Sequence, residues 1–166
     1  SRSGEYNQNS KKIVTAGRFG PEKGFDMLVQ VADKVLRANP DWSWDLYGAG
    51  ETFESVKAQA ESLGLTGRLN FMGETTQMLS LYKNYALYVL PSYREGLPLV
   101  LLEAKANSLP IVSFNCLTGP AEIVRHGVNG YLINCYDINE MANKINELIS
   151  NPELRCRFAA AAKLDM

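Results

Sequence analysis

The sequence has few of the residues that build metal sites or disulfide frameworks. It contains one histidine, His126, and three cysteines, Cys116, Cys135 and Cys156, with no two cysteines at a metal-ligand spacing such as Cys-x2-Cys. An odd number of scattered cysteines favours free thiols in a cytosolic protein. His126 lies in a glycine-bounded turn with no second histidine or cysteine near it, which favours a polar turn residue over a metal ligand or catalytic base.

Neither sign of charge dominates, and no long apolar run is present. Seventeen basic and 18 acidic side chains give a net charge of -1, which argues against a sequence-wide attraction to nucleic acid or to an anionic membrane. An anionic ligand would have to be bound by a local site. No apolar stretch approaches the length of a membrane span. The 166 residues, 46% of them hydrophobic, suffice for one packed domain and are too few for two large ones.

Short apolar runs alternate with amphipathic ones from residue 11 onward, which indicates strands interleaved with helices. The polar residues 1–10 are predicted to be a linker or a vector-derived remnant, and residues 11–166 a single domain. The strands look apolar on both faces, as in a doubly wound, Rossmann-like parallel sheet covered by helices on both sides. Ligands of such sheets bind beyond the carboxyl ends of the strands. We expect strands at 11–17, 42–48, 68–73, 85–90, 110–114 and 130–133, and helices at 24–38, 51–63, 75–83, 98–108, 137–149 and 152–163.

The loop after the first predicted strand, AGRFGPEKG, combines glycines with cations. Gly17, Gly20 and Gly24 let the backbone turn tightly, and Arg18 and Lys23 flank the turn just before a helix N-terminus, where backbone N–H groups favour anions. The pattern predicts a diphosphate cradle, although a structural loop with two solvated cations has the same signature. It matches neither a Walker A loop nor Gly-x-Gly-x-x-Gly, which disfavours phosphoryl transfer and nicotinamide chemistry.

The second predicted strand ends in another glycine turn. Gly48 and Gly50 lead into a helix, but Phe53 stands where a dinucleotide fingerprint would need its third glycine. Two interpretations remain open at this point. The turn lets a ligand approach the backbone, or it only joins a strand to a helix.

Two glutamates flank the start of the fourth predicted helix. In SYREGLPLVLLEA, Glu95 falls in the loop after a strand and Glu103 nearly two turns into an apolar helix. A carboxylate in such surroundings must be paired or hydrogen-bonded, because burying an unpaired charge is costly. Ligand hydroxyls would satisfy it, and so would a structural salt bridge or a local patch of solvent.

Taken together, these motifs resemble the carboxyl-terminal half of retaining glycosyltransferases of family 4, which have the GT-B architecture. The segments GRFGPEKGFDML, LYGAGE, NFMGE, LPSYREGLPLVLLEA and GPAEIVRHGVNGYLI occur in this order over about residues 11–163. The most specific part is Glu95-x7-Glu103 after Pro-Ser. The loop at 119–122 carries Gly-Pro-Ala-Glu where many relatives carry Gly-Gly, and Thr118 or Gly119 could start a short helix with Glu122. The chain stops at Met166, before a terminal helix that many relatives have.

The resemblance implies a donor site for a nucleotide sugar. Gly17 would belong to this site, and Arg18 and Lys23 would bind the diphosphate and stabilise the leaving nucleotide. Glu95 would face the sugar hydroxyls, with backbone N–H groups of Gly96 and Leu97 near the phosphates. Glu103 would accept hydrogen bonds from the ribose, and the base would lie against the backbone near Met72 and Gly73.

The implied activity is transfer of a sugar from a nucleotide diphosphate sugar, a UDP-sugar in the first place, to an acceptor of cell-surface polysaccharide or glycolipid synthesis. The implied partners are that donor and a missing amino-terminal acceptor domain, without nucleic acid, and the missing half would carry any peripheral membrane contact. We therefore expect a cytoplasmic enzyme, active at the inner face of the membrane, that needs no metal or other cofactor. This chain alone would bind the donor but transfer poorly. Half of a non-hydrolysing nucleotide-sugar epimerase and a non-catalytic binding module remain alternatives.

Overall fold

A computed structural model describes residues 6–92, 99–115 and 123–164. Six strands form one sheet in the order β3-β2-β1-β4-β5-β6, and every strand pair is parallel. All carboxyl ends therefore meet at one edge, as the doubly wound prediction requires. The strands are β1 (Lys12–Ala16), β2 (Ser43–Tyr47), β3 (Leu69–Gly73), β4 (Leu87–Leu90), β5 (Ile111–Phe114) and β6 (Gly130–Ile133).

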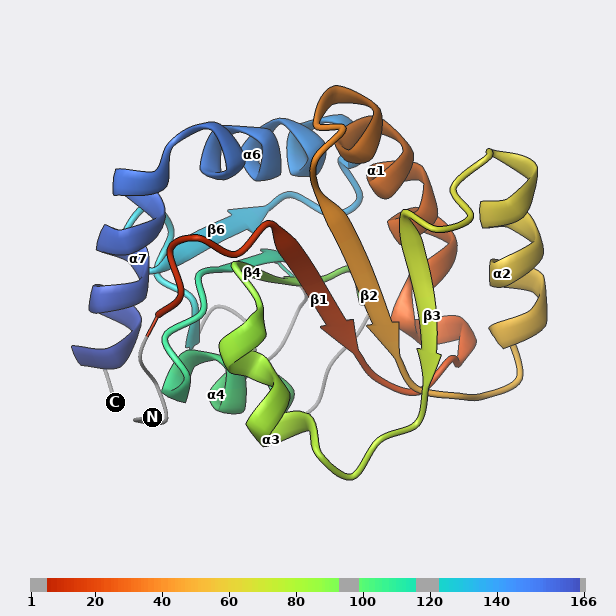
Figure 1. Ribbon diagram of the computed structural model, residues 1–166, viewed down its shortest axis with the longest axis horizontal. Coiled ribbons are helices and arrows are strands. Elements are labelled where there is room, and N and C mark those ends of the chain that lie inside the picture. The colour runs from red at the N-terminus through yellow and green to blue at the C-terminus, as the bar shows by residue number, and fades with distance from the viewer. Residues whose placement is uncertain (1–5, 93–98, 116–122, 165–166) are drawn as a thin grey trace.

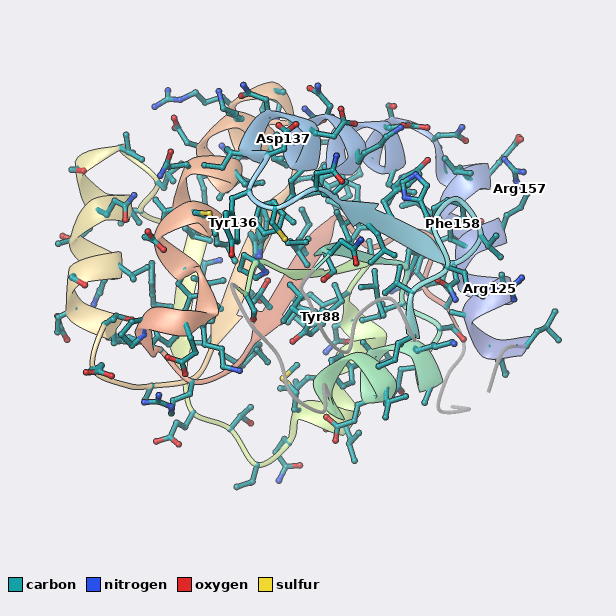
Figure 2. All side chains as sticks on the ribbon, turned by 180° about the vertical axis from the view of Figure 1, so that it is seen from behind. Tyr88, Arg125, Tyr136, Asp137, Arg157 and Phe158 are labelled. Atoms are coloured by element: carbon teal, nitrogen blue, oxygen red, sulfur yellow. The ribbon has the colours of Figure 1, made fainter. Side chains whose placement is uncertain are left out.

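Helices cover both faces of the sheet (Figure 1). One face carries α1 (Phe25–Ala38), α2 (Phe53–Ser62) and α6 (Ile138–Ser150), and the other carries α3 (Met78–Leu81), the 3-10 helix η2 (Tyr82–Asn84) and α4 (Leu99–Ala106). The last helix, α7 (Pro152–Leu164), packs against α4 and α6. Phe158 of α7, labelled in Figure 2, packs edge-on against Tyr131 of β6 at 5.2 Å between ring centroids.

Alternation along the strands builds two cores. Ile13 of β1 faces the α1 side of the sheet, whereas the next residue, Val14, faces the α4 side. On β2, Trp44 joins the first core and Tyr47 the second. Residues on both faces of β1 and β2 are buried, which explains why these strands lack a polar face in the sequence.

Local signals set most helix boundaries. α1 begins directly after Gly24, as the loop composition predicts, and α7 begins with Pro152, whose missing N–H has no intrahelical role there. The Asp137 carboxylate caps α6 by accepting from the Glu140 N–H at 2.9 Å. The helix predicted at 75–83 is shorter than expected, because the Thr75 hydroxyl accepts from the Gln77 N–H at 3.0 Å and forms a turn first.

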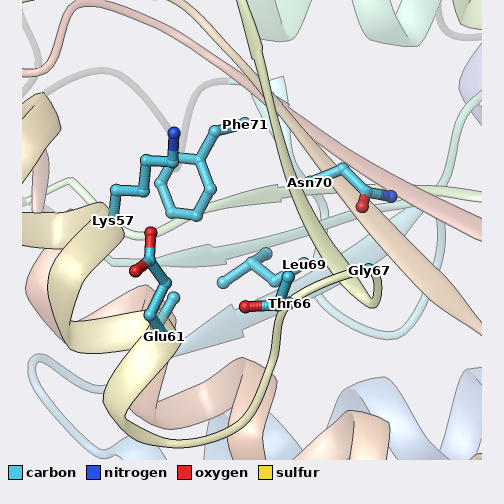
Figure 3. A pocket seen from close by; sticks show the side chains of 8 residues that line it. Lys57, Glu61, Thr66, Gly67, Leu69, Asn70 and Phe71 are labelled. Atoms are coloured by element: carbon cyan, nitrogen blue, oxygen red, sulfur yellow. The ribbon is translucent and has the colours of Figure 1, made fainter.

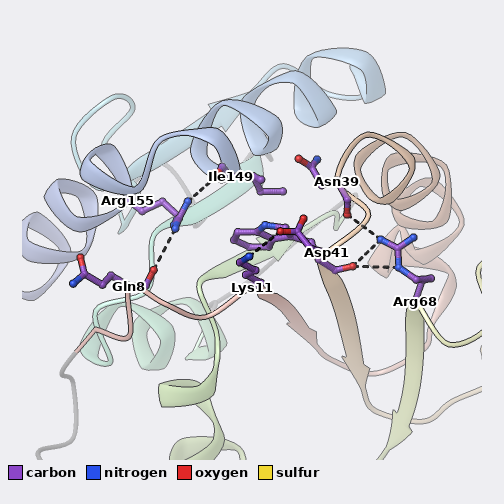
Figure 4. A network of polar contacts seen from close by, with 8 residues as sticks. Gln8, Lys11, Asn39, Asp41, Arg68, Ile149 and Arg155 are labelled. Carbon is purple, nitrogen blue, oxygen red and sulfur yellow. Dashed lines mark hydrogen bonds and ion pairs between the residues drawn. The ribbon is translucent and has the colours of Figure 1, made fainter.

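Two arginines fasten loops at the amino-terminal edge of the sheet, opposite the expected ligand edge (Figure 4). Arg68 donates to the carbonyls of Leu36, Asn39 and Trp42 at 2.7–3.0 Å and thereby closes the end of α1. Arg155 is 4% exposed and donates to the last carbonyls of α6. These contacts give both cations a structural role. Within the described ranges, no helix is long and apolar enough to cross a membrane.

Candidate functional site

A cleft of about 390 Å³ opens at the carboxyl ends of β1, β2 and β3. Its walls come from the three loops that follow these strands, from α3 and from α4, so segments far apart in sequence meet there. Three residues predicted from the sequence to bind the donor, Gly17, Arg18 and Glu103, lie together in this cleft. The lining residues are Ala16, Gly17, Arg18, Tyr47, Gly48, Ala49, Glu74, Thr75, Met78 and Glu103.

Backbone hydrogen bonds continue past the strand ends and hold the loops together. The Gly17 N–H donates to the Tyr47 carbonyl at 3.0 Å, and the Gly48 N–H donates to the Gly73 carbonyl at 2.8 Å. Gly48 has a φ of +137°, and a Cβ atom there would lie 1.9 Å from the Gly17 carbonyl oxygen. Only glycine fits such an approach. The sequence left the role of the Gly-x-Gly turn undecided. The structure gives it at least a structural role, which is to bring two loops into contact.

Arg18 stands at the cleft, held by acidic neighbours. Its guanidinium lies 3.1 Å from the Glu22 carboxylate and 4.0 Å from that of Glu51, and its side chain is 58% exposed. The pKa of Glu22 is lowered mainly by a hydrogen bond from the backbone of its own loop, and less by the neighbouring Arg18. An exposed pair of this kind is weak, so Arg18 can exchange a carboxylate for another anion at little cost.

Lys23 and Gly24 lie at the end of the loop that joins β1 to α1. Lys23 ends the short 3-10 helix η1 (Pro21–Lys23) and is half-buried, and the described cleft lining does not include it. Gly24 has a φ of +70° and precedes α1. A Cβ atom on Gly24 would lie 1.9 Å from the carbonyl oxygen of Pro91, which follows β4. The N-terminus of α1 is thus packed directly against the loop that leads toward α4.

Glu103 projects from α4 into the cleft and is half-buried, not enclosed. A structural salt bridge was one explanation for an acid in this apolar helix, but Glu103 forms no ion pair with any described residue. A half-buried carboxylate at a cleft remains available to solvent or to ligand hydroxyls. Of the alternatives that the sequence left open, the salt bridge is the one that finds no support in the described part of the chain.

Tyr82 is a neighbour of Glu103 in the packed chain. Its side chain is fully buried, and its hydroxyl has no hydrogen-bond partner of good geometry among the described residues. Burial raises the pKa of the Tyr82 hydroxyl, and the neighbouring Glu103 carboxylate raises it further. Tyr82 therefore keeps its proton at neutral pH and can donate a hydrogen bond.

A buried carboxylate orients the tyrosine at the floor of the cleft. Asp45, 4% exposed, accepts from the Tyr85 hydroxyl at 2.7 Å and from the Asn70 side-chain amide at 3.0 Å. The Tyr85 and Tyr47 hydroxyls lie 3.0 Å apart. Since Tyr85 has one proton and gives it to Asp45, the Tyr47 hydroxyl must donate to Tyr85. This chain of hydrogen bonds fixes the Tyr47 ring against the cleft, a role that sequence reasoning did not assign.

The residues predicted to meet the base lie beside the lining. Met72 is 48% exposed, and Gly73 has a φ of +81° with its carbonyl engaged by Gly48. The cleft contacts begin one residue later, with Glu74 and Thr75. Neither was singled out from the sequence, and the only signal for them was their position directly after a predicted strand.

Several predicted site residues fall outside the described ranges. These are Glu95, Gly96 and Leu97 in the loop before α4, and Thr118, Gly119 and Glu122 with the proposed short helix after β5. Their roles stay predictions.

His126 is a turn residue, as its position predicts. Its Nδ1 accepts from the Leu132 N–H at 3.0 Å, and its ring packs against Tyr131 at 5.3 Å between centroids. Cys135 and Cys156 are free thiols. Across residues 6–92, 99–115 and 123–164, no three histidine, cysteine, aspartate or glutamate side chains cluster as metal ligands.

A second cavity of about 240 Å³ lies between α2 and the outer strand β3 (Figure 3). Lys57 and Glu61 of α2 stand over it, and Leu69 and Phe71 of β3 line its other side. It lies to the side of the sheet and includes none of the predicted donor-site residues. The cleft at the strand ends is therefore the better candidate, since it gathers glycines, a cation and a carboxylate at the usual ligand edge.

Curated relatives share this sequence over most of its length. An uncharacterised glycosyltransferase of Haemophilus influenzae is 38% identical over 155 residues, which is 93% of this chain and 44% of that protein. A poly(ribitol-phosphate) alpha-N-acetylglucosaminyltransferase of Staphylococcus aureus is 30% identical over 94% of this chain and 32% of its own length. This chain thus spans less than half of each of these relatives.

The fold also matches a solved structure. A variant of TarM from S. aureus, crystallised with Fondaparinux, alpha-GlcNAc-glycerol and UDP, superposes with a TM-score of 0.93 at 28% identity, over 97% of this chain and 32% of that one. The family model described as "Glycosyl transferases group 1" matches residues 1–165. The glycine-rich loops, the cleft at the strand ends and these matches together show that the chain belongs to the group 1 glycosyl transferases.

Proposed function

We propose that this chain is the donor-binding, carboxyl-terminal half of a retaining family 4 glycosyltransferase with GT-B architecture. The observation that carries the proposal is the cleft in which Gly17, Arg18 and Glu103 meet at the carboxyl ends of the strands. The donor would be a nucleotide diphosphate sugar, with UDP-sugars first, because the similar TarM structure contains UDP. The name of the S. aureus relative, which acts on poly(ribitol-phosphate), supports a polymeric acceptor, and we assign the acceptor to cell-surface polysaccharide or glycolipid synthesis.

The cleft suggests how charge would be handled. Arg18 would release Glu22 and Glu51 and turn to the diphosphate, where a charge-assisted bond offsets the negative charge that develops on the leaving nucleotide. Lys23 would support the diphosphate from the end of η1. Glu103 would accept hydrogen bonds from the ribose hydroxyls.

The remaining roles concern parts that the described structure does not contain. Glu95 would meet the sugar hydroxyls and Gly96 and Leu97 the phosphates. The acceptor site would lie in a further half of the protein, for which the relatives' greater lengths leave room. This chain alone would then bind donor without efficient transfer. We place the whole enzyme in the cytoplasm, at the inner face of the membrane, without a metal requirement.

The first experiment is a thermal-shift panel of UDP-, GDP- and ADP-sugars on the 166-residue chain. Selective stabilisation by the UDP-sugars is expected, since a ligand that binds only the folded state raises the melting temperature. Stabilisation by GDP- or ADP-sugars alone would show that the donor carries that nucleotide and not UDP. No stabilisation by any of the three classes would contradict the donor-binding function.

The second experiment tests the site with matched variants. Arg18→Ala should weaken UDP binding by roughly 1 to 3 kcal/mol, the range for a charge-assisted hydrogen bond. The control is Arg37→Ala, because Arg37 is similarly exposed (64%) and also pairs with an acid four residues away, Asp33, but lies on α1 away from the cleft. Equal UDP affinities for the two variants would show that Arg18 does not contact the nucleotide. Glu103→Ala should lower UDP affinity by a similar amount.

A further inference from the structure

The Tyr82 hydroxyl is exceptional among the buried tyrosines of the described chain. Its ring packs edge-on against Tyr88 at 6.1 Å between centroids. The Tyr88 hydroxyl is engaged on both sides, because it donates to the Ala16 carbonyl at 2.9 Å and accepts from the Ala16 N–H at 3.2 Å. The Tyr82 hydroxyl, by contrast, is buried and has no hydrogen-bond partner of good geometry in the described part of the chain. Buried hydroxyl groups without partners are rare and costly in native proteins.

The position of Tyr82 connects it to the cleft. It follows α3 directly, and its N–H donates to the carbonyl of Met78, a cleft residue. It shares one apolar cluster with Met78 and with Leu102, the residue before Glu103. The Glu103 carboxylate raises the pKa of the Tyr82 hydroxyl both through its charge and as a hydrogen-bond acceptor, so the two side chains are neighbours even though their hydrogen bond is poorly formed. The Tyr82 hydroxyl is therefore next to Glu103, the acidic residue that lines the cleft.

We propose that Tyr82 is a positioning residue for Glu103 that forms its hydrogen bond when a nucleotide occupies the cleft. One carboxylate oxygen of Glu103 would then bind the ribose hydroxyls while the other accepts from the Tyr82 hydroxyl. The inference rests on the proposed function, in which Glu103 is the ribose ligand. In the free protein the Tyr82 hydroxyl is near the Glu103 carboxylate but forms no hydrogen bond of good geometry with a described residue. In the bound protein that bond would be well formed, so the hydroxyl favours the bound state.

The test is Tyr82→Phe in the 166-residue chain, with two measurements: the stability of the free protein should not fall, whereas the affinity for UDP should. The melting temperature of the free protein should stay the same or rise, because the variant removes an unpaired buried hydroxyl and keeps the ring. The affinity for UDP, measured by isothermal titration calorimetry, should fall about tenfold, as for loss of a hydrogen bond to a charged group. A tyrosine that only fills the core would not produce this combination.

A matched control is Tyr131→Phe. Tyr131 is also buried and donates to a glutamate, Glu147, at 2.9 Å, but neither residue lines the cleft. This variant should lower the melting temperature of the free protein and leave UDP affinity unchanged. In a Glu103→Ala background, Tyr82→Phe should cause no further loss of affinity, because the two side chains act as one unit.

The outcomes distinguish a failure of the Tyr82 inference from a failure of the proposed donor-binding function. If Glu103→Ala weakens UDP binding but Tyr82→Phe does not, the positioning role is wrong and the donor site stands. If Tyr82→Phe lowers the melting temperature or fails to fold, its hydroxyl supports the free structure and the inference is overturned. If Glu103→Ala leaves UDP affinity unchanged, the ribose assignment and the inference fail together.

Discussion

Replacing Gly24 with alanine tests how tightly the N-terminus of α1 is packed against the loop after β4. Gly24 and Gly64 have nearly the same φ, +70° and +75°, in the left-handed region. They differ in their surroundings. A Cβ atom on Gly24 would lie 1.9 Å from the Pro91 carbonyl oxygen, whereas one on Gly64 would meet nothing within 4 Å. Gly64→Ala is therefore a control that carries the conformational cost without the steric one.

The magnitudes follow from these two costs. A left-handed conformation costs a residue with a Cβ roughly 1 to 2 kcal/mol, and both variants carry this cost. Gly24→Ala must also displace the Pro91 backbone, and overpacking of this kind costs about 1 to 3 kcal/mol more. For a chain of this size, 1 kcal/mol corresponds to about 2 to 4 °C in melting temperature. Gly24→Ala should therefore melt about 2 to 12 °C below Gly64→Ala.

The assay is urea unfolding of both variants, followed by circular dichroism, with thermal melts in parallel. Equal slopes against urea would show that both variants unfold from equally compact states, so that their midpoints can be compared. Equal losses of stability in the two variants would refute the reasoning, because the contact with Pro91 would then contribute nothing.

Two further predictions concern tyrosines that are buried or partly buried. Tyr85→Phe removes one of the two donors to the buried Asp45 carboxyl, leaving Asn70, and should lower the free energy of unfolding by roughly 1.5 to 3 kcal/mol in urea titrations; a loss below 0.5 kcal/mol (an order-of-magnitude limit) would show that the bond is unimportant. Burial raises the pKa values of Tyr6 and Tyr131 to about 12, so both hold their protons in the folded state at pH values where the unfolded chain releases them. Stability should consequently be unaffected below pH 10 and fall as the pH rises toward 12, and Tyr6→Phe should reduce that slope by up to about 1.4 kcal/mol per pH unit. An unchanged slope in the variant would contradict the assignment.

Much of the fold could be predicted from the sequence because its signals are local. Apolar runs placed all six strands within two residues of their observed ends. The glycine loop before Phe25 and the proline at 152 located the starts of α1 and α7. The helix predicted at 75–83 was too long, because the turn made by the Thr75 hydroxyl outweighs a helical periodicity that extends through it, and α3 begins only at Met78.

The sequence by itself determined the class of fold and the parallel sheet, and it predicted a ligand-binding edge with Gly17, Arg18 and Glu103 as candidates. Only the tertiary structure decided which side chains meet there. Tyr47 and Thr75 join the cleft because adjacent parallel strands end side by side, a proximity that spacing along the chain does not encode. The surroundings of Glu103 likewise depend on contacts between segments distant in sequence, because pairing and burial are properties of the packed chain and not of the helix that carries the residue.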